Sequence, residues 1–223
     1  CSYRLEVGHP PGAPFFMLLG RFFTLFAGGD TSKVAMMVNI LSAFASAFTI
    51  LFLFWTITIL VKKIVAADGT MDAGKLISIM GSGFVGALAY TFSDSFWFSA
   101  VEGEVYASSS FFTAIVFWAM FKWESVADEK HANRWIILIA YLMGLSIGIH
   151  LLNLLTIPAL AFIYYFRKYK PTTSGIILTA IAGVAILGII QYGIISTLVK
   201  IAAKFDLFFV NGMGMPFWSG FIV

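Results

Sequence analysis

Three polar segments interrupt an otherwise apolar sequence, and each carries side chains able to bind or transform a ligand. The first is Gly8–Pro14, where three prolines and two glycines surround His9. Proline lacks the backbone N–H and clashes with the preceding turn, so this segment cannot be the interior of a helix. Histidine as a residue type titrates near neutral pH, which makes His9 a candidate for contacting a phosphate or transferring a proton. An ordinary interfacial histidine in a turn is the alternative.

The second segment, 93–106, combines two carboxylates with a phenol. Glu102 and Tyr106 are four residues apart, so on a helix they would share a face and Glu104 would point elsewhere. Ionisable groups this close to hydrocarbon are candidates for function. The alternative is a solvated loop with ordinary exposed acids.

The third segment joins two apolar stretches near His150. Ser146, His150 and Asn153 follow the spacing i, i+4 and i+7, which predicts one face of a continuous helical turn. Gly144 and Gly148 form a Gly-xxx-Gly surface beside it, a pattern that allows helices to approach closely. A ligand-binding turn and an interhelical hydrogen-bond network both fit this pattern, and both interpretations stay open.

The sequence does not support a metal site or a soluble nucleotide donor. Its three histidines, at positions 9, 131 and 150, lack metal-site spacing, and Cys1 is the single cysteine. No Gly-rich phosphate-binding fingerprint is present. The net charge of +3 is small and dispersed, so nucleic acid is not an expected partner. A ligand taken from the lipid bilayer fits this sequence better.

The elements that must position these residues belong to an integral membrane protein. Of the 223 residues, 60% are hydrophobic and 11% are charged, and the mean hydropathy is +0.93. A soluble domain is about half apolar and about one quarter charged. Six tryptophans and eight tyrosines suit the interfacial belts of such proteins.

The predicted fold is all-α, a polytopic transmembrane helix bundle with about six spans plus one short interfacial helix. Residues 15–27 would reach only about 20 Å, short of the roughly 30 Å hydrocarbon core, so this helix with Arg21 is expected to lie in the interface. The expected spans are 32–61, 76–98, 105–121, 135–150, 151–166 and 174–199. We expect 1–223 to be a single transmembrane domain truncated at both ends, with outer loops at 1–14 and 200–223.

Lysine and arginine counts predict the orientation. The two sets of alternate connections hold nine and five basic residues. The larger set is Lys62, Lys63, Lys75, Lys122, Lys130, Arg134, Arg167, Lys168 and Lys170, and the smaller is Arg4, Arg21, Lys33, Lys200 and Lys204. The positive-inside rule assigns the larger set to the cytoplasm. All three polar segments are then expected on the outer side.

These three segments together resemble a known family. Val7–Pro14, the run FSDSFWFSAVEGEVY at 92–106, and GLSIGIHLLNLL at 144–155 resemble bacterial membrane proteins grouped as domain-of-unknown-function 2723. That family is similar to the protein O-mannosyltransferases of the GT-C glycosyltransferase superfamily. The resemblance implies inverting transfer from a polyprenyl-phosphate sugar donor in the bacterial inner membrane. It also implies an acceptor hydroxyl outside the cytoplasm, for example that of a protein Ser or Thr.

The resemblance also bears on the catalytic residues. The acidic motif of the family would precede Cys1, so the catalytic base is expected upstream and is not assigned here. Glu6, Glu102 and Glu104 are weak substitutes. No divalent metal or other cofactor is implied by the residues present.

We therefore hypothesise a membrane glycosyltransferase whose bilayer supplies the lipid-linked sugar. His9, Arg21, His150 and Asn153 would contact the donor, while Glu102, Glu104 and Tyr106 would shape the acceptor side. A transporter or flippase subunit is the alternative, although we find no internal repeat of the kind such folds show. A non-catalytic structural membrane subunit would explain the apolar mass but not three polar segments on one side.

Overall fold

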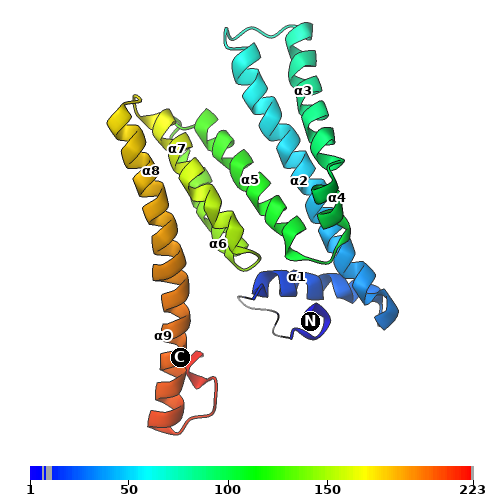
Figure 1. The fold of residues 1–223 in the computed structure, drawn as a ribbon, viewed down its shortest axis with the longest axis vertical. Helices are drawn as coiled ribbons and strands as arrows, with labels where there is room; N and C mark the ends of the chain where they lie inside the picture. The colour runs from blue at the N-terminus through cyan, green and yellow to red at the C-terminus, as the bar shows by residue number, and fades with distance from the viewer. Residues whose placement is uncertain (7, 9–11, 222–223) are drawn as a thin grey trace. The chain divides into compact units, whose positions relative to one another are not determined.

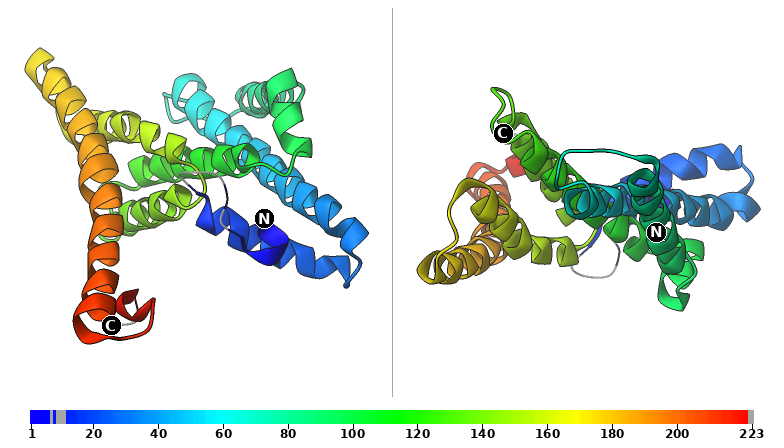
Figure 2. Two further views of the ribbon diagram at one scale, coloured as in Figure 1. Left: turned by 60° about the horizontal axis from the view of Figure 1, so that its bottom comes forward. Right: turned by 90° about the horizontal axis from the view of Figure 1, so that it is seen from above.

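A computed structural model describes residues 1–6, 8 and 12–221 of the chain. All regular elements in these residues are helical (Figures 1 and 2). The chain divides into two compact units, Cys1–Thr156 and Ile157–Val223. His9, with Val7, Pro10 and Pro11, lies outside the described residues.

The first unit begins with a short helix that packs along a second. The 3-10 turn η1 (Ser2–Arg4) lies on α1 (Pro14–Thr24), which begins at a proline and continues as η2 (Leu25–Ala27). Proline suits a helix start because its missing N–H would have no partner there. The helix is apolar and too short to span, as expected for residues 15–27.

A glycine pair reverses the chain between α1 and the next helix. Gly28 and Gly29 have φ angles of 61° and 87°, which strain any residue with a Cβ. Asp30 then accepts a hydrogen bond from the Ser32 N–H (3.0 Å), as expected for a helix cap. The following helix, η3 (Thr31–Lys33) with α2 (Val34–Val65), returns beside α1 (Figure 2).

Helix α2 is the element against which most of the first unit packs. It contacts α1, α3 (Ala73–Thr91), α4 (Asp94–Val101) and α5 (Val105–Ser125). Ser42, Ser46 and Thr49 on α2 are buried, so a row of small polar side chains on this helix faces the bundle. Helix α5 carries several fully buried side chains, including those of Val116 and Trp123.

The expected span 76–98 is wrong, because the helix ends at Thr91. Ser93 is extended (φ −73°, ψ 137°), and its hydroxyl donates to the Tyr90 carbonyl at 2.8 Å. Short polar side chains of this kind compete with the helical backbone for its hydrogen bonds. Residues 94–101 consequently form a separate short helix, α4, with Asp94 in its first turn.

The first unit closes with α6 (Asn133–Ile147) and the 3-10 helix η4 (Leu151–Thr156). Between them, the Gly148 carbonyl accepts hydrogen bonds from the backbone N–H groups of Phe15 (2.8 Å) and Phe16 (3.3 Å). A Cβ at Gly148 would lie 2.8 Å from the Phe15 Cβ. The start of α1 is therefore seated directly on the end of α6, and only glycine fits there without a shift.

The second unit is a helical hairpin followed by a continuous helical run. Helix α7 (Ile157–Lys168) packs against α8 (Thr173–Gly188). The helix then continues through a π-helical turn η5 (Ile189–Ile195), α9 (Ser196–Leu207) and a second π turn η6 (Phe208–Gly212). It therefore extends past Lys200, where an outer loop is expected; a 3-10 turn, η7 (Ser219–Phe221), follows.

Four helical segments among the described residues are long and apolar enough to cross a membrane. They are Thr31–Val65, Ala73–Thr91, Val105–Ser125 and Thr173–Gly212. The predicted fourth and fifth spans correspond to shorter helices, since α6 has 15 residues and α7 has 12. The all-helical, multi-pass character is thus confirmed, and the count of six spans stays a prediction.

The helices of the first unit have two chemically different ends. At the basic end, which we define by Lys62, Lys63, Lys75 and Lys122, the Lys63 ammonium pairs with the Glu124 carboxylate and joins α2 to α5. Helices α2 and α5 both begin at the opposite end, where Val34 and Val105 lie near Ala13 and Phe16. The connections of the first unit therefore alternate between its two ends, as the count of Lys and Arg in alternate connections assumes. Which compartment each end faces stays a prediction.

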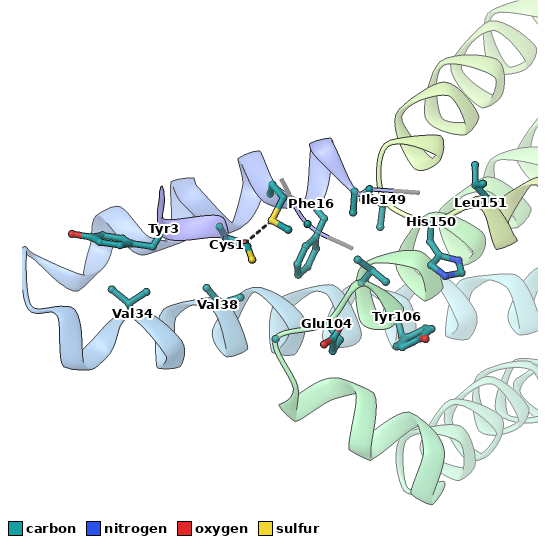
Figure 3. Close-up of a pocket in the computed structure, with 17 residues that line it drawn as sticks. Cys1, Tyr3, Phe16, Val34, Val38, Glu104, Tyr106, Ile149, His150 and Leu151 are labelled. Carbon is teal, nitrogen blue, oxygen red and sulfur yellow. Dashed lines mark hydrogen bonds between the residues drawn. The ribbon is translucent and has the colours of Figure 1, made fainter. Parts of the chain in front are cut away.

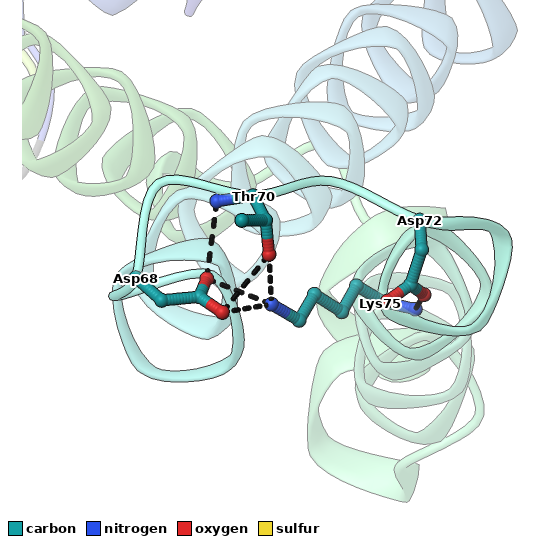
Figure 4. A network of polar contacts seen from close by, with 4 residues as sticks. All are labelled: Asp68, Thr70, Asp72 and Lys75. Atoms are coloured by element: carbon teal, nitrogen blue, oxygen red, sulfur yellow. Dashed lines mark hydrogen bonds and ion pairs between the residues drawn. The ribbon is translucent and has the colours of Figure 1, made fainter.

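A compact polar network closes the α2–α3 connection at the basic end (Figure 4). The Lys75 Nζ lies 2.7 Å from both carboxylate oxygens of Asp68, and Asp72 caps α3 by accepting from the Lys75 N–H. The Lys75 ammonium and then the Thr70 N–H and hydroxyl hold the pKa of Asp68 below its usual value. The contribution of Asp68 to stability is present above its ordinary pKa and is lost as pH falls through the lowered value.

We predict that Gly148→Ala destabilises the first unit by about 1–3 kcal/mol, because the added methyl must displace Phe15 and stretch both hydrogen bonds to α1. Thermal unfolding in detergent measures the effect. Gly144→Ala is the matched control: no atom lies within 4 Å of the place that its methyl would take, so stability should be unchanged or rise by up to about 1 kcal/mol. Equal effects of the two changes would contradict the packing described here.

We predict that Lys75→Met raises the pKa of Asp68 toward its ordinary value, because the change removes the largest cause of the shift. Carboxyl ¹³C titration by NMR measures this. Asp30 serves as the internal control, since its lowered pKa is caused by Ser32 and Lys33 and should not move. An Asp68 titration identical in the two proteins would show that the network does not form.

Candidate functional site

A cavity of about 820 Å³ opens at the end of the first unit opposite the basic end (Figure 3). Four parts of the chain line it: residues 1–3, 8, 12, 13, 16 and 17, the start of α2, the connection 103–106 and the turn 149–151. Its described lining residues are Cys1, Ser2, Tyr3, Gly8, Gly12, Ala13, Phe16, Met17, Val34, Val38, Gly103, Glu104, Val105, Tyr106, Ile149, His150 and Leu151. Residues of all three polar segments therefore line the cavity; Gly8 and Gly12 belong to the first of these segments.

The wall beneath the cavity is a hydrophobic cluster that ties these segments together. Phe16, Leu41, Phe112 and Ile149 are buried against one another. Phe15 meets Phe112 edge to face, with ring centroids 6.2 Å apart. Because protein interiors are closely packed, this cluster fixes α1 and the His150 turn relative to α2 and α5.

Glu104 reaches the cavity because the chain before α5 is extended and not helical. Glu102 (φ −97°, ψ 143°) ends α4, and Glu104 (φ −119°, ψ 164°) precedes α5. The predicted shared helical face of Glu102 and Tyr106 is therefore wrong; Glu104 and Tyr106 line the cavity together, whereas Glu102 does not line it.

Gly103 holds this connection against α2. A Cβ there would lie 2.9 Å from Asn39 Oδ1 and 3.0 Å from Val38 Cγ1. Glu104 is exposed, and its carboxylate forms no hydrogen bond or ion pair with any residue that the structure describes. Glu104 lines the cavity, and its acceptor oxygens are available to a ligand.

His150 lines the cavity, and one of its ring nitrogens has a defined hydrogen-bond role. Its Nδ1 accepts a hydrogen bond from the Leu152 N–H at 3.2 Å. In the neutral ring the proton is consequently on Nε2, which becomes a hydrogen-bond donor. The ring lies beside Tyr106, with centroids 5.6 Å apart and planes at 48° (Figure 3). A carboxylate, a phenol and an imidazole N–H thus share one opening, a set suited to hydroxyl and phosphate groups.

Asn153 points away from the cavity and into the bundle. Its Oδ1 accepts hydrogen bonds from the hydroxyls of Ser109 (3.2 Å) and Thr113 (2.6 Å) on α5. The predicted common face of Ser146, His150 and Asn153 is wrong, because α6 ends at Ile147 and the chain tightens into η4. For Asn153 the structure shows the interhelical bonds that the packing interpretation predicts.

The remaining predicted residues lie outside the cavity or outside the described residues. Arg21 is not in the lining; its guanidinium lies 5.1 Å from the Tyr3 ring centroid and donates to Thr24 Oγ1 at 3.3 Å. His9 belongs to the segment that the structure does not describe. No group of three or more His, Cys, Asp or Glu side chains suited to a metal occurs within residues 1–6, 8 and 12–221.

Sequence reasoning missed the contribution of the first three residues. Ser2 is buried against Gly20 of α1, and its hydroxyl lies 3.2 Å from the Met17 sulfur. This seats Tyr3 and Cys1 at the cavity rim. The only available signal was Gly20, a small residue inside an otherwise bulky apolar helix.

A family model and two known proteins that are similar to this chain point to the same family. A family model described as the protein O-mannosyl-transferase TMEM260 N-terminal domain matches residues 1–173. Protein O-mannosyl-transferase tmem260 of Dictyostelium discoideum is 24% identical over 115 residues, which are 52% of this chain and 12% of that protein. Protein O-mannosyl-transferase TMEM260 of Mus musculus is 26% identical over 147 residues, which are 66% of this chain and 18% of that protein. The matches thus span less than a fifth of either relative, and no solved structure matches the chain.

We predict that Asn153→Leu lowers stability by about 1–3 kcal/mol, because it removes the shared acceptor of two hydroxyls on α5. Asn133→Leu is the control, since Asn133 is exposed at the start of α6. Thermal unfolding in detergent distinguishes them. A loss of stability no larger for Asn153→Leu than for Asn133→Leu would contradict a structural role for this amide.

Proposed function

This chain belongs to the family of the protein O-mannosyl-transferase TMEM260 N-terminal domain, and from that premise we propose that it forms part of a membrane glycosyltransferase. The enzyme would transfer a sugar from a polyprenyl-phosphate donor to a hydroxyl of an extracytoplasmic acceptor, such as a protein Ser or Thr. The single observation that carries the proposal is the cavity where Glu104, Tyr106 and His150 meet. The apolar helices around it make a lipid-linked donor accessible from the bilayer.

The cavity has the mixed character that such a donor needs. Phe16, Val38 and Ile149 provide an apolar side, while Glu104, Tyr106 and His150 provide a polar one. A polyprenyl-phosphate sugar has the same division, because its chain is apolar and its phosphate and sugar are polar. We assign the polar side to the phosphate and sugar.

Each polar residue has a role that follows from its position. His150 would donate its Nε2–H to a phosphate oxygen of the donor. Glu104 would accept a hydrogen bond from the acceptor hydroxyl, and Tyr106 would hold the sugar between them. Asn153 would act as a positioning residue, because it fixes η4, which follows directly after His150, to α5. His9 and Arg21 are retained as donor-side contacts.

The proposed reaction is an inverting transfer. The acceptor oxygen bonds to the anomeric carbon from one face while the bond from that carbon to the phosphate oxygen breaks on the other. The electron pair leaves with the phosphate, and a carboxylate takes the acceptor proton. We assign no catalytic base; Glu104 lines the cavity, whereas Glu102 does not and is not retained as a candidate.

The placement in the cell forms part of the same proposal. We place the chain in a bacterial inner membrane, with the cavity facing away from the cytoplasm and a GT-C-like architecture. The excess of Lys and Arg in the opposite set of connections supports this orientation. The relationship to the domain-of-unknown-function 2723 proteins is proposed on the same three motifs.

We predict that Glu104→Gln in the full-length protein lowers kcat/KM by about tenfold to a hundredfold, the effect of losing a hydrogen bond to a charged group. Transfer of labelled mannose from polyprenyl-phosphate mannose to a Ser/Thr peptide measures it. Glu102→Gln is the matched control, two residues away and outside the cavity lining, and should leave kcat/KM unchanged. His150→Ala should be impaired in the same way, with His131→Ala as its control. Equal rates for Glu104→Gln and Glu102→Gln would overturn the proposed site.

A further inference from the structure

A second groove, of about 540 Å³, lies between α7 and α8 in the second unit. Small residues of α8 form its floor: Gly175, Thr179 and Ala182. The Thr179 hydroxyl donates to the Gly175 carbonyl at 2.8 Å, so it offers no free donor to the groove. The groove is consequently apolar along its length, and aromatic side chains flank one end.

The length of the groove matches one leaflet of a bilayer. Its lining on α8 extends from Gly175 to Ile186. The eleven residue-to-residue steps of α-helix between them measure about 16 Å, and half of the hydrocarbon core is about 15 Å. A single acyl chain lying along the groove would therefore run from the interface to the middle of the membrane.

Tyrosines and lysines mark the interfacial end of the groove. Tyr164, Tyr165 and Tyr169 line it, and tyrosine is enriched where the hydrocarbon meets the headgroups. Lys168 follows Tyr164 and Tyr165 at i+4 and i+3, so it extends the lining face of α7 by one turn.

Lys170 is held at the same end by backbone contacts. The Tyr165 hydroxyl donates to the Lys170 carbonyl (3.3 Å) and accepts from the Thr172 N–H (3.0 Å). The connection between α7 and α8 is thereby fastened over the end of the groove. The sequence contains no Asp or Glu between Glu129 and Asp206, so the charged side chains that α7, α8 and their connection themselves supply are all basic.

We infer that this groove binds one anionic phospholipid, with an acyl chain between α7 and α8 and its headgroup phosphate at Lys168 and Lys170. The cations complement the phosphate, and the tyrosines lie at headgroup level. Basic residues at the cytoplasmic ends of helices attract anionic lipids, and the positive-inside count places this end on that side. The inference is independent of the proposed glycosyl transfer, and it uses the membrane orientation proposed above.

The test is native mass spectrometry of the full chain purified with phosphatidylglycerol or phosphatidylcholine. We expect one phosphatidylglycerol to be retained about tenfold better than phosphatidylcholine. The double variant Lys168→Gln, Lys170→Gln should lose this preference, and Lys200→Gln, Lys204→Gln is the matched control on α9. Both lysines at the groove are exposed, so the variant is expected to fold, and circular dichroism checks this.

A second pair of variants tests the acyl chain. Thr179→Phe would fill the groove and lower retention of both lipids, whereas Ile181→Phe, on an exposed face of α8 outside the groove, would not. Equal retention of the two lipids by the unchanged chain would overturn the inference, as would equal preferences in the two lysine variants. Preferential retention of polyprenyl phosphate over phosphatidylglycerol would overturn the assignment to a phospholipid.

Discussion

The Gly148 carbonyl joins two parts of the chain that are more than 130 positions apart in sequence, and the candidate site depends on that junction. The first N–H groups of a helix have no partner within it. In α1, those of Phe15 and Phe16 are satisfied by the carbonyl that follows α6. The positive end of one helix dipole thus meets the negative end of another. Ile149 and His150 come directly after this carbonyl, so the same contact that holds α1 also sets the position of the imidazole.

The rest of the first unit supports this junction by close packing more than by polarity. Lipid removes the hydrophobic drive between helices, so small residues and interhelical hydrogen bonds carry their association. Buried Ser42 and Ser46 on α2 and Ala119 on α5 follow this pattern. Asn153 adds hydrogen bonds from η4 to α5. The Lys63–Glu124 pair joins α2 and α5 at the end of the bundle opposite the cavity.

The helical character and the polar clustering could be predicted from the sequence, because both follow from local composition. Apolar runs of sufficient length indicate helices, and charged connections indicate where they end; α2 and α5 lie close to their expected bounds. The predictions failed where a helix was assumed to continue. Glu102 and Tyr106 are predicted to share one helical face, and Ser146, His150 and Asn153 another, yet the backbone is extended at Glu102 and tightens into a 3-10 helix before Asn153. The hydrogen bond between Phe15 and Gly148, and the seating of Ser2 on Gly20, are contacts that no local pattern specifies.

The central claim is that residues from the second and third polar segments share one face of the membrane and one cavity. Membrane-impermeant maleimide labelling of intact cells tests it most directly, using Glu104→Cys, His150→Cys and His131→Cys separately in a Cys1→Ser background. Cys1 must be replaced because it is exposed and lines the cavity. The account predicts labelling at positions 104 and 150 from outside, and at position 131 only after permeabilisation. Labelling of 104 and 150 from opposite sides would contradict it.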